Sequence, residues 1–321
     1  MTTKNRYPQL GFQRDWVWRG WQIRYTYIRA KLNRTTTPNN PATPMIFLHG
    51  FGAAIGHWRY SLQELSQSHT VYALDLLGFG ASQKAIANYD TTLWADLVHD
   101  FWLTFIQEPA ILVGNSVGSL VALVAAARYP QMAKGAVAIS LPDPSAQTEA
   151  IPGWMLPIVE AIQNTVASPP VLRSLFYIVR RRSLVRNWAK LAYENPNAVT
   201  DELIDILATP ATDRGAARAF SILFQVMGSP RLGPGVKTVL PDINVPILIL
   251  WGAQDRLIPL RFANPSKYLQ YNPLIKFVEL ERGGHCPQDE CPELVHREIL
   301  AWIAYFSQKQ DSENIDSDCI P

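Results

Sequence analysis

Short apolar runs recur along the chain, and each is rich in Ile, Val, Leu or Ala. Runs of this kind are typical of strands that are buried on both faces of a parallel sheet. They lie at 45–48, 71–74, 110–113, 136–139, 246–251 and 275–278. Helix-like segments lie between most of them or follow the last, at 92–106, 117–128, 261–269 and 293–306. The alternation predicts an α/β fold, with a mostly parallel central sheet flanked by helices on both faces.

The start of the chain follows a different pattern. Aromatic and aliphatic side chains recur at every second position, first at Trp16 and Trp18 and again within 21–27. Gly20 separates the two stretches. A period of two on either side of a glycine predicts an N-terminal β-hairpin whose strands have one apolar face.

The regular alternation stops between 143 and 242, where several helical patterns and few strand patterns are found. One of these patterns repeats at i, i+3, i+4 and i+7 along a single helical face. It consists of Leu172, Leu175, Phe176 and Val179. Thr200 is placed to cap a helix at 201–207, because two acidic residues occupy the first turn. We therefore predict a helical cap that is inserted over the ends of the strands.

These patterns define the expected organisation of the chain. The core consists of 1–142 and 243–308, and the cap consists of 143–242. The last segment, 309–321, is predicted to be a disordered acidic tail, because it carries four acids and no apolar periodicity.

The composition narrows the class of protein. Among 321 residues, 48% are hydrophobic and 17% are charged, which is too apolar for a disordered chain. The net charge of +2 argues against binding to nucleic acid. Cys286 and Cys291 lack the C-x-x-C spacing of a zinc site, and no metal or cofactor is expected. We expect a cytoplasmic protein, since the N-terminus resembles no signal peptide and no apolar run is long enough to span a membrane.

The strongest chemical signal is the sequence Gly-Asn-Ser-Val-Gly at 114–118. It follows an apolar run and begins a helix-like segment, which is the context of a G-x-S-x-G nucleophile elbow. A turn this tight between strand and helix leaves no room for side chains beside the serine, so glycines are needed there. We predict that Ser116 is the nucleophile.

A serine hydroxyl needs an adjacent base and an acid that orients the base. His285 lies in a glycine-rich loop just after the last predicted strand, and Asp255 follows the strand before it. Both therefore lie at the carboxyl edge of the sheet, where ligands bind to open α/β sheets. Asp143 also follows a strand, so it stays open as an alternative acid. The remaining histidines are expected to be solvated or capping; they are His57, His69, His99 and His296.

An oxyanion formed by attack on a carbonyl needs preorganised N–H donors. His-Gly-Phe-Gly at 49–52 follows a predicted strand, and we expect the Phe51 N–H to be one donor. The Val117 N–H, directly after the serine at a helix N-terminus, is the second. His49 is expected to pack beneath the loop, and Asp75 to tie neighbouring loops together.

Five motifs in this order resemble those of the α/β-hydrolase superfamily over nearly the whole chain. They are HGFG at 49–52, DLLGFGAS at 75–82, GNSVG at 114–118, WGAQD at 251–255 and GGHCPQDECPE at 283–293. The resemblance implies a triad of Ser116, Asp255 and His285. It also argues against the haloalkane dehalogenase and epoxide hydrolase branches, because their nucleophile is an aspartate.

Three of the sequences are more specifically similar to a photosynthetic group within this superfamily. They are GNSVG, LPDPS at 141–145 and HCPQDECPE at 285–293. The group includes pheophytinase and chlorophyll dephytylase, which hydrolyse the phytol ester of chlorophyll pigments. The resemblance implies a cyanobacterial or plastid setting and the neighbourhood of a thylakoid membrane.

The predicted cap is apolar and aromatic, so Trp154, Phe176 and Phe224 are candidate substrate-binding residues. These side chains could equally form the cap's own core. The segment 172–190 carries six basic residues and no acid. This pattern is typical of a helix that lies on an anionic membrane, and also of a solvated helix paired with acids elsewhere.

The favoured function is therefore hydrolysis of a carboxylic ester with a bulky hydrophobic group through an acyl-enzyme, with a phytol ester as the narrower expectation. Two alternatives stay open. One is a carbon–carbon hydrolase or cofactor-free haloperoxidase-like enzyme with the same triad, because one fold hosts many chemistries. The other is a non-catalytic protein that binds a hydrophobic ligand.

Overall fold

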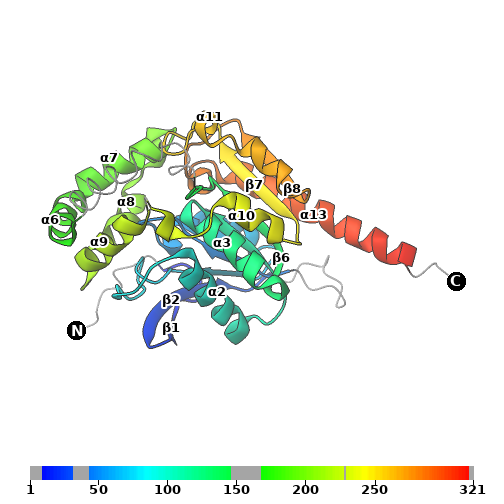
Figure 1. Ribbon diagram of the computed structural model, residues 1–321, viewed down its shortest axis with the longest axis horizontal. Coiled ribbons are helices and arrows are strands. Elements are labelled where there is room, and N and C mark those ends of the chain that lie inside the picture. The colour runs from blue at the N-terminus through cyan, green and yellow to red at the C-terminus, as the bar shows by residue number, and fades with distance from the viewer. Residues whose placement is uncertain (1–8, 32–42, 146–167, 228, 318–321) are drawn as a thin grey trace.

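The computed structural model describes residues 9–31, 43–145, 168–227 and 229–317, with backbone only from 307 onward. A single sheet of eight strands lies at its centre, in the order β1-β2-β4-β3-β5-β6-β7-β8 (Figure 1). Strands β3 to β8 are parallel to one another, and β2 pairs with β4 in antiparallel register. This sheet confirms the predicted α/β class.

The N-terminal hairpin consists of β1 (Arg14–Trp18) and β2 (Trp21–Ile28), with Trp18 opposite Trp21. The two residues of the turn, Arg19 and Gly20, have φ angles of 49° and 84°. Positive φ at both central positions defines the type I′ turn, whose twist matches that of the strands. The predicted hairpin is thus confirmed at the edge of the sheet.

All six apolar runs are strands. They are β3 (Met45–Leu48), β4 (Val71–Leu74), β5 (Ala110–Asn115), β6 (Ala133–Ile139), β7 (Ile247–Gly252) and β8 (Ile275–Leu280). Side chains of β5 alternate between two apolar clusters, with Leu112 in one cluster and Ile111 and Val113 in the other. Strands that are buried on both faces explain why these runs are continuously apolar.

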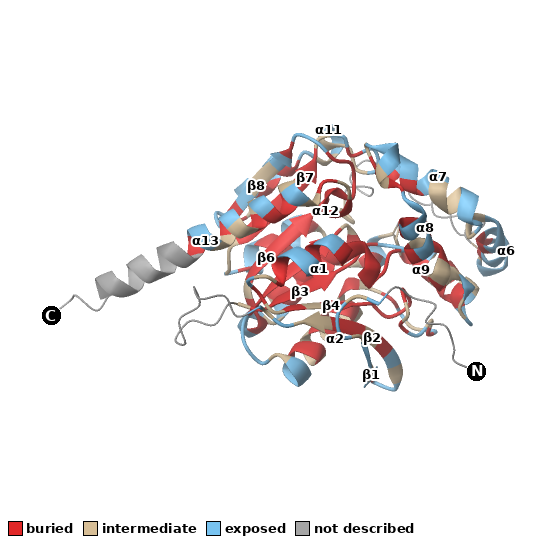
Figure 2. Ribbon diagram, turned by 180° about the vertical axis from the view of Figure 1, so that it is seen from behind, coloured by how far each residue is buried: buried red, intermediate tan, exposed pale blue. Residues whose placement is uncertain are grey.

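Helices cover both faces of the sheet. Side chains of α2 (Thr91–Phe105), α3 (Val117–Arg128) and α10 (Val236–Val239) pack in the first cluster. Those of α1 (Arg59–Leu65) and α13 (Pro292–Ser317) pack in the second. Figure 1 shows the first group in front of the sheet, and Figure 2 shows the second from behind.

The described residues between β6 and β7 form helices and no strand. Besides α10, this helical insertion contains α6 (Pro169–Val179), α7 (Arg182–Ala192), α8 (Asp201–Ala208) and α9 (Ala216–Met227). Thr200 caps α8, because its hydroxyl accepts a hydrogen bond from the Leu203 N–H at 3.2 Å. On α6, Leu172 and Phe176 are buried, whereas Leu175 is 39% exposed. Trp154 lies outside the described residues.

Two elements differ from expectation. The segment 261–269 is not one helix but two short ones, α11 (Leu260–Ala263) and the 3₁₀ helix η8 (Pro265–Gln270). Asn264 separates them with a left-handed φ of 43°, and Pro265 cannot continue the first helix. Helix α13 runs to Ser317, so the backbone is helical through most of the segment for which a disordered tail was expected. Within the described residues, no helix is long and apolar enough to cross a membrane.

Candidate active site

Ser116 lies at the junction of β5 and α3, where the chain turns directly from strand into helix. Its φ of 53° and ψ of −124° are unusual for a residue with a side chain. Such a conformation costs about 1–3 kcal/mol and is kept only where the surroundings hold it. The Ser116 N–H donates to the Ile139 carbonyl of β6 at 2.8 Å, which fixes the turn against the neighbouring strand.

The two glycines of the motif are required by contact rather than by flexibility. A Cβ atom on Gly114 would lie 2.1 Å from the Gly118 carbonyl oxygen. One on Gly118 would lie 2.1 Å from the Leu48 carbonyl oxygen at the end of β3. The first turn of α3 therefore rests directly on the backbone of two strands. This close packing leaves Ser116 partly exposed while the residues on either side of it are buried.

Asp255 and His285 are in contact. The Asp255 Oδ2 atom lies 2.8 Å from His285 Nδ1, and both side chains are buried. The other carboxylate oxygen, Oδ1, accepts from the N–H groups of Leu257 and Ile258, each at 2.8 Å. Hydrogen bonds on both oxygens fix the orientation of the carboxylate, so it can hold one ring nitrogen of the histidine.

Asp143, the alternative acid, is hydrogen-bonded to residues other than His285. Asp143 Oδ1 accepts from the Ser145 N–H and hydroxyl, at 3.0 Å and 2.8 Å. It also accepts from the Val236 N–H at 3.2 Å, at the start of α10. Asp143 therefore ties the end of β6 to the helical insertion, whereas Asp255 alone of the two carboxylates bonds to His285.

Asn115 connects the nucleophile elbow to the loop that carries His285, the segment 281–286 after β8, which we call the histidine loop. Its side-chain amide donates to the His285 carbonyl at 3.0 Å, and Asn115 immediately precedes Ser116. Ser116 itself forms no hydrogen bond with His285 among the described residues. The hydrogen bond between base and nucleophile is often long in enzymes without substrate. The sequence offered no signal for the role of Asn115 beyond its place beside the serine.

The loop after β3 lies against Ser116. A Cβ atom on Gly50 would be 3.1 Å from Ser116 Cβ, so the backbone at Gly50 and Phe51 passes close to the serine. Val117 is the first residue of α3, where the helix offers its N–H no carbonyl partner. Phe51 and Val117 thus lie on the two segments that adjoin Ser116.

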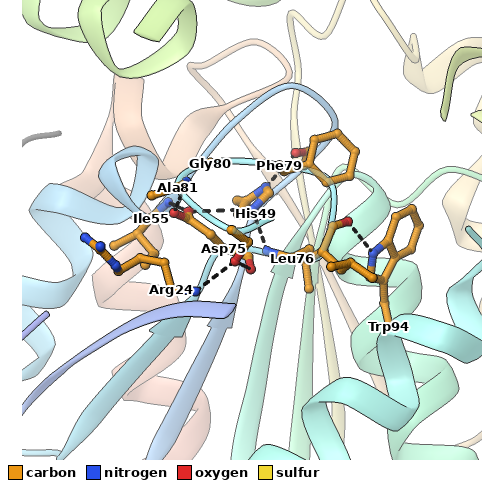
Figure 3. Close-up of polar contacts among 12 residues, drawn as sticks. Arg24, His49, Ile55, Asp75, Leu76, Phe79, Gly80, Ala81 and Trp94 are labelled. Carbon is orange, nitrogen blue, oxygen red and sulfur yellow. Dashed lines mark hydrogen bonds and ion pairs between the residues drawn. The ribbon is translucent and has the colours of Figure 1, made fainter. Parts of the chain in front are cut away.

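His49 and Asp75 have the structural roles expected of them (Figure 3). His49 Nε2 accepts from the Leu76 N–H at 3.1 Å, and Nδ1 lies 2.8 Å from the Gly50 carbonyl. Burial lowers the pKa of His49, so the ring is neutral. The Asp75 carboxylate accepts from the N–H groups of Ile55 and Ala81, and so joins the loop after β3 to the loop after β4.

A second group of buried polar side chains lies behind the histidine loop. Asp289, on the short helix α12 (Pro287–Glu290), contacts Arg59 Nη1 at 2.6 Å and accepts from the Tyr193 hydroxyl at 2.7 Å. His57 Nε2 lies 2.9 Å from that hydroxyl. Burial raises the pKa of Asp289 to about 6, and burial together with the Arg59 charge lowers the pKa of His57 to about 3. Sequence analysis missed this group, although Asp289 lies within the histidine motif.

The other histidines are mostly buried rather than solvated. His69 Nδ1 contacts the Thr43 carbonyl at 2.9 Å, and His296 Nε2 contacts the Ser61 hydroxyl at 3.0 Å. With His57 also buried, three of the four are neither solvated nor bonded to the backbone of a helix end, so the expectation of solvated or capping histidines was wrong for them. Each has a partner that a sequence pattern cannot reveal.

Of the expected substrate-binding residues, Phe176 is 5% exposed and Phe224 is 45% exposed. Phe176 therefore packs within the insertion, whereas the ring of Phe224 is available for contact. Within the described residues, no group of three His, Cys, Asp or Glu side chains is arranged to hold a metal ion.

The fold and the elbow define the class, and comparison with known proteins gives the family. Residues 43–292 match the model of the alpha/beta hydrolase fold family, so the chain belongs to that family. It is 23% identical to the chloroplastic pheophytinase of Arabidopsis thaliana over 87% of this chain and 65% of the relative. It is 25% identical to epoxide hydrolase 4 of Homo sapiens over 83% of this chain and 74% of the relative.

A solved structure of a membrane phospholipase A has a TM-score of 0.69 and 24% identity, covering 91% of this chain and 86% of that one. This chain spans less than two thirds of the length of the pheophytinase. The family match establishes the fold of this chain, and the three relatives are named for different activities.

Proposed function

We propose that the protein is a serine hydrolase that cleaves a carboxylic ester through an acyl-enzyme. The contact between Asp255 and His285, held beside the elbow of Ser116 by Asn115, carries this proposal. A serine with positive φ at the start of a helix costs free energy, and such conformations are commonly kept at functional sites. It presents the hydroxyl at the carboxyl edge of the sheet, where the histidine loop also ends.

In the proposed mechanism, Ser116 Oγ attacks the ester carbonyl while His285 Nε2 accepts its proton. Asp255 holds Nδ1 and stabilises the imidazolium. The oxyanion accepts hydrogen bonds from the N–H groups of Phe51 and Val117. His285 then returns the proton to the leaving alcohol, and water repeats the sequence on the acyl-enzyme. The protein groups in this proposed mechanism are the side chains of Ser116, His285 and Asp255 and the two backbone N–H groups.

A fluorophosphonate probe tests the nucleophile, because an unactivated serine reacts poorly with it. The probe is expected to label Ser116 in the native protein, and Ser116→Ala is expected to lose both labelling and hydrolysis of p-nitrophenyl acetate. Ser174→Ala, which removes an exposed serine of α6, serves as the matched control. Full hydrolysis by the Ser116 variant would refute the assignment. An acyl adduct found on Ser116 by mass spectrometry would favour ester cleavage over carbon–carbon or haloperoxidase-like chemistry.

For the substrate, we propose an ester with a bulky hydrophobic group, and more narrowly the phytol ester of chlorophyll or pheophytin. The similarity to the pheophytinase and the apolar side chains of the insertion support this choice. Incubation with both pigments in detergent, followed by chromatography, is expected to give chlorophyllide or pheophorbide. Their absence under conditions where short esters are cleaved would eliminate the pigment proposal and leave the esterase proposal intact.

We also propose that the enzyme lies on the cytoplasmic side at the periphery of an anionic membrane, such as a thylakoid. On α7, Trp188 is 61% exposed, and on α6, Ile178 is 49% exposed. Arg182 and Arg186 pair with Asp205 and Asp201 of α8, so part of the basic run is compensated within the insertion. Apolar side chains exposed beside the remaining cations support contact with lipid.

A further inference from the structure

Three phenylalanines form a continuous row from the loop beside Ser116 to the helical insertion. The ring of Phe51 lies 6.5 Å from that of Phe220 on α9, and the ring of Phe220 lies 5.5 Å from that of Phe224. Neighbouring rings at these separations are in van der Waals contact. We call Phe51, Phe220 and Phe224 the phenylalanine row.

The row leaves apolar surface uncovered. Phe51 is 38% exposed and Phe224 is 45% exposed, and Phe220 between them is only partly buried. Phe176, by contrast, lies 5.2 Å from Phe220 and is 5% exposed, so it supplies the packed side of the same cluster. Contiguous exposed aromatic surface is uncommon on a protein unless it binds something.

One end of the row is fixed relative to the site. Phe51 follows Gly50, whose backbone lies against Ser116. Its ring also contacts Phe79 at 5.6 Å, and Phe79 contacts the fully buried Trp94 at 5.8 Å. The core therefore holds this end of the row rigidly. The other end belongs to α9, where Phe220 and Phe224 are one turn apart and share a face.

We propose that the phenylalanine row binds the apolar part of the ester, and that Phe220 determines how long a chain the enzyme prefers. This inference rests on the proposed function and deepens it. With the carbonyl at Ser116, a long alkyl chain passes over Phe51 first, then Phe220 and then Phe224. A short acyl group ends before it reaches Phe220. The substrate class is thus an ester whose apolar chain extends well beyond the carbonyl.

The test compares kcat/KM for p-nitrophenyl acetate with kcat/KM for the octanoate and dodecanoate. Phe220→Ala is expected to lower the ratio of dodecanoate to acetate about tenfold, roughly the effect of losing the burial of two methylene groups. Phe220→Leu keeps an apolar side chain and is expected to lower the ratio less. Phe12→Ala is the matched control, because Phe12 is 55% exposed and contacts Tyr27 at the hairpin instead.

Two readouts separate this inference from the proposed function. If Ser116 reacts with a fluorophosphonate in Phe220→Ala but the chain-length ratio stays at the native value both for the p-nitrophenyl esters and for a matching series of alkyl acetates, the phenylalanine row has no role in selectivity and the esterase proposal stands. If the native protein neither labels nor cleaves any ester, both proposals fall. Equal loss of ratio in Phe12→Ala would also overturn the inference, because it would show that the effect is not local. A second series of alkyl acetates, compared in the same variants, assigns the row to the acyl or the alcohol side.

Discussion

At Asp255, both carboxylate oxygens are engaged, one by His285 and the other by two backbone N–H groups. Replacing it with Asn keeps the shape but puts an amide where the imidazole needs an acceptor. We expect Asp255→Asn to lower kcat by about 10⁴-fold, the size of effect known for an orienting aspartate in a serine protease.

Asp143→Asn is the matched comparison, because Asp143 bonds to Ser145 and Val236 and not to the histidine. We expect it to reduce kcat by less than about tenfold while lowering stability, because it weakens an anchor of the insertion by about 1–3 kcal/mol. The rates at which Asp255→Asn and Asp143→Asn hydrolyse p-nitrophenyl acetate show which of the two aspartates orients His285. A large loss in Asp143→Asn alone would mean that the acid has been assigned to the wrong strand.

Asp289 makes the protein less stable as pH rises, which is the opposite of the usual effect of a buried, paired carboxyl group. Because burial raises its pKa from 3.8 to about 6, the folded protein retains a proton that the unfolded chain releases. Its contribution to stability therefore declines as pH rises from about 4 to about 6, by about 3 kcal/mol at most. We expect the free energy of unfolding of the native protein, minus that of Asp289→Asn, to fall over this range in urea titrations. Asp242→Asn, at an exposed site, should show no such trend; a difference that rises with pH would contradict the prediction.

At the residue scale, a position at the edge of the sheet was predictable wherever a strand pattern directly precedes the residue in the sequence. Ser116, Asp255 and His285 each follow a strand, and parallel strands end at the same edge. Tyr193 and Asp289 are 96 positions apart, and Arg59 and Asp289 are 230 apart, so nothing local in the sequence could pair them. Phe220 was missed for a similar reason, because its importance comes from the ring of Phe51 across the fold.

At the scale of elements, the junction of β5 and α3 brings the backbone of a helix directly against the backbone of two strands. A methyl group on Gly118 would overlap the Leu48 carbonyl, whereas one on Gly20 would meet nothing within 4 Å. Gly20 has a φ of 84°, so Gly20→Ala should cost only the conformational penalty of about 1–2 kcal/mol. We expect Gly118→Ala to cost more than about 3 kcal/mol, since backbone must move. Urea unfolding measures both, and equal losses would show that the elbow can relax.

Elements with a regular pattern were predicted closely, and the exceptions have local causes. The buried strands stand out because they are apolar on both faces. The segment 261–269 is divided because Asn264 adopts a left-handed φ, which the apolar pattern alone does not reveal. Helix α13 continues beyond Phe306, the last position of the apolar pattern predicted at 293–306. Periodicity detects the part of a helix that packs, and cannot set the end of a helix that extends past the core.

At the scale of the molecule, α6 and α7 follow one another along the outer margin in both views (Figures 1 and 2). If this margin meets lipid, the protein should co-sediment with vesicles of phosphatidylcholine and phosphatidylglycerol more than with phosphatidylcholine alone, and less at high salt. Trp188→Ser is expected to reduce binding severalfold. Val17→Ser, at a 70% exposed position on β1, should not. Equal binding to neutral vesicles, or equal loss in both variants, would remove the anionic membrane from the proposal.

The main chain of His285 is bonded to the helical insertion: its N–H donates to the Ala192 carbonyl, the last residue of α7, at 2.7 Å. A bulky ester that pushes α7 outward must either stretch this bond or carry the imidazole with it. On the proposed function, a displacement of α7 by the substrate would therefore act on the main chain of the proton acceptor. On the same proposal, a substrate that fits without displacing α7 leaves His285 in contact with Asp255, whereas one that displaces α7 also strains the hydrogen bond between His285 and Ala192.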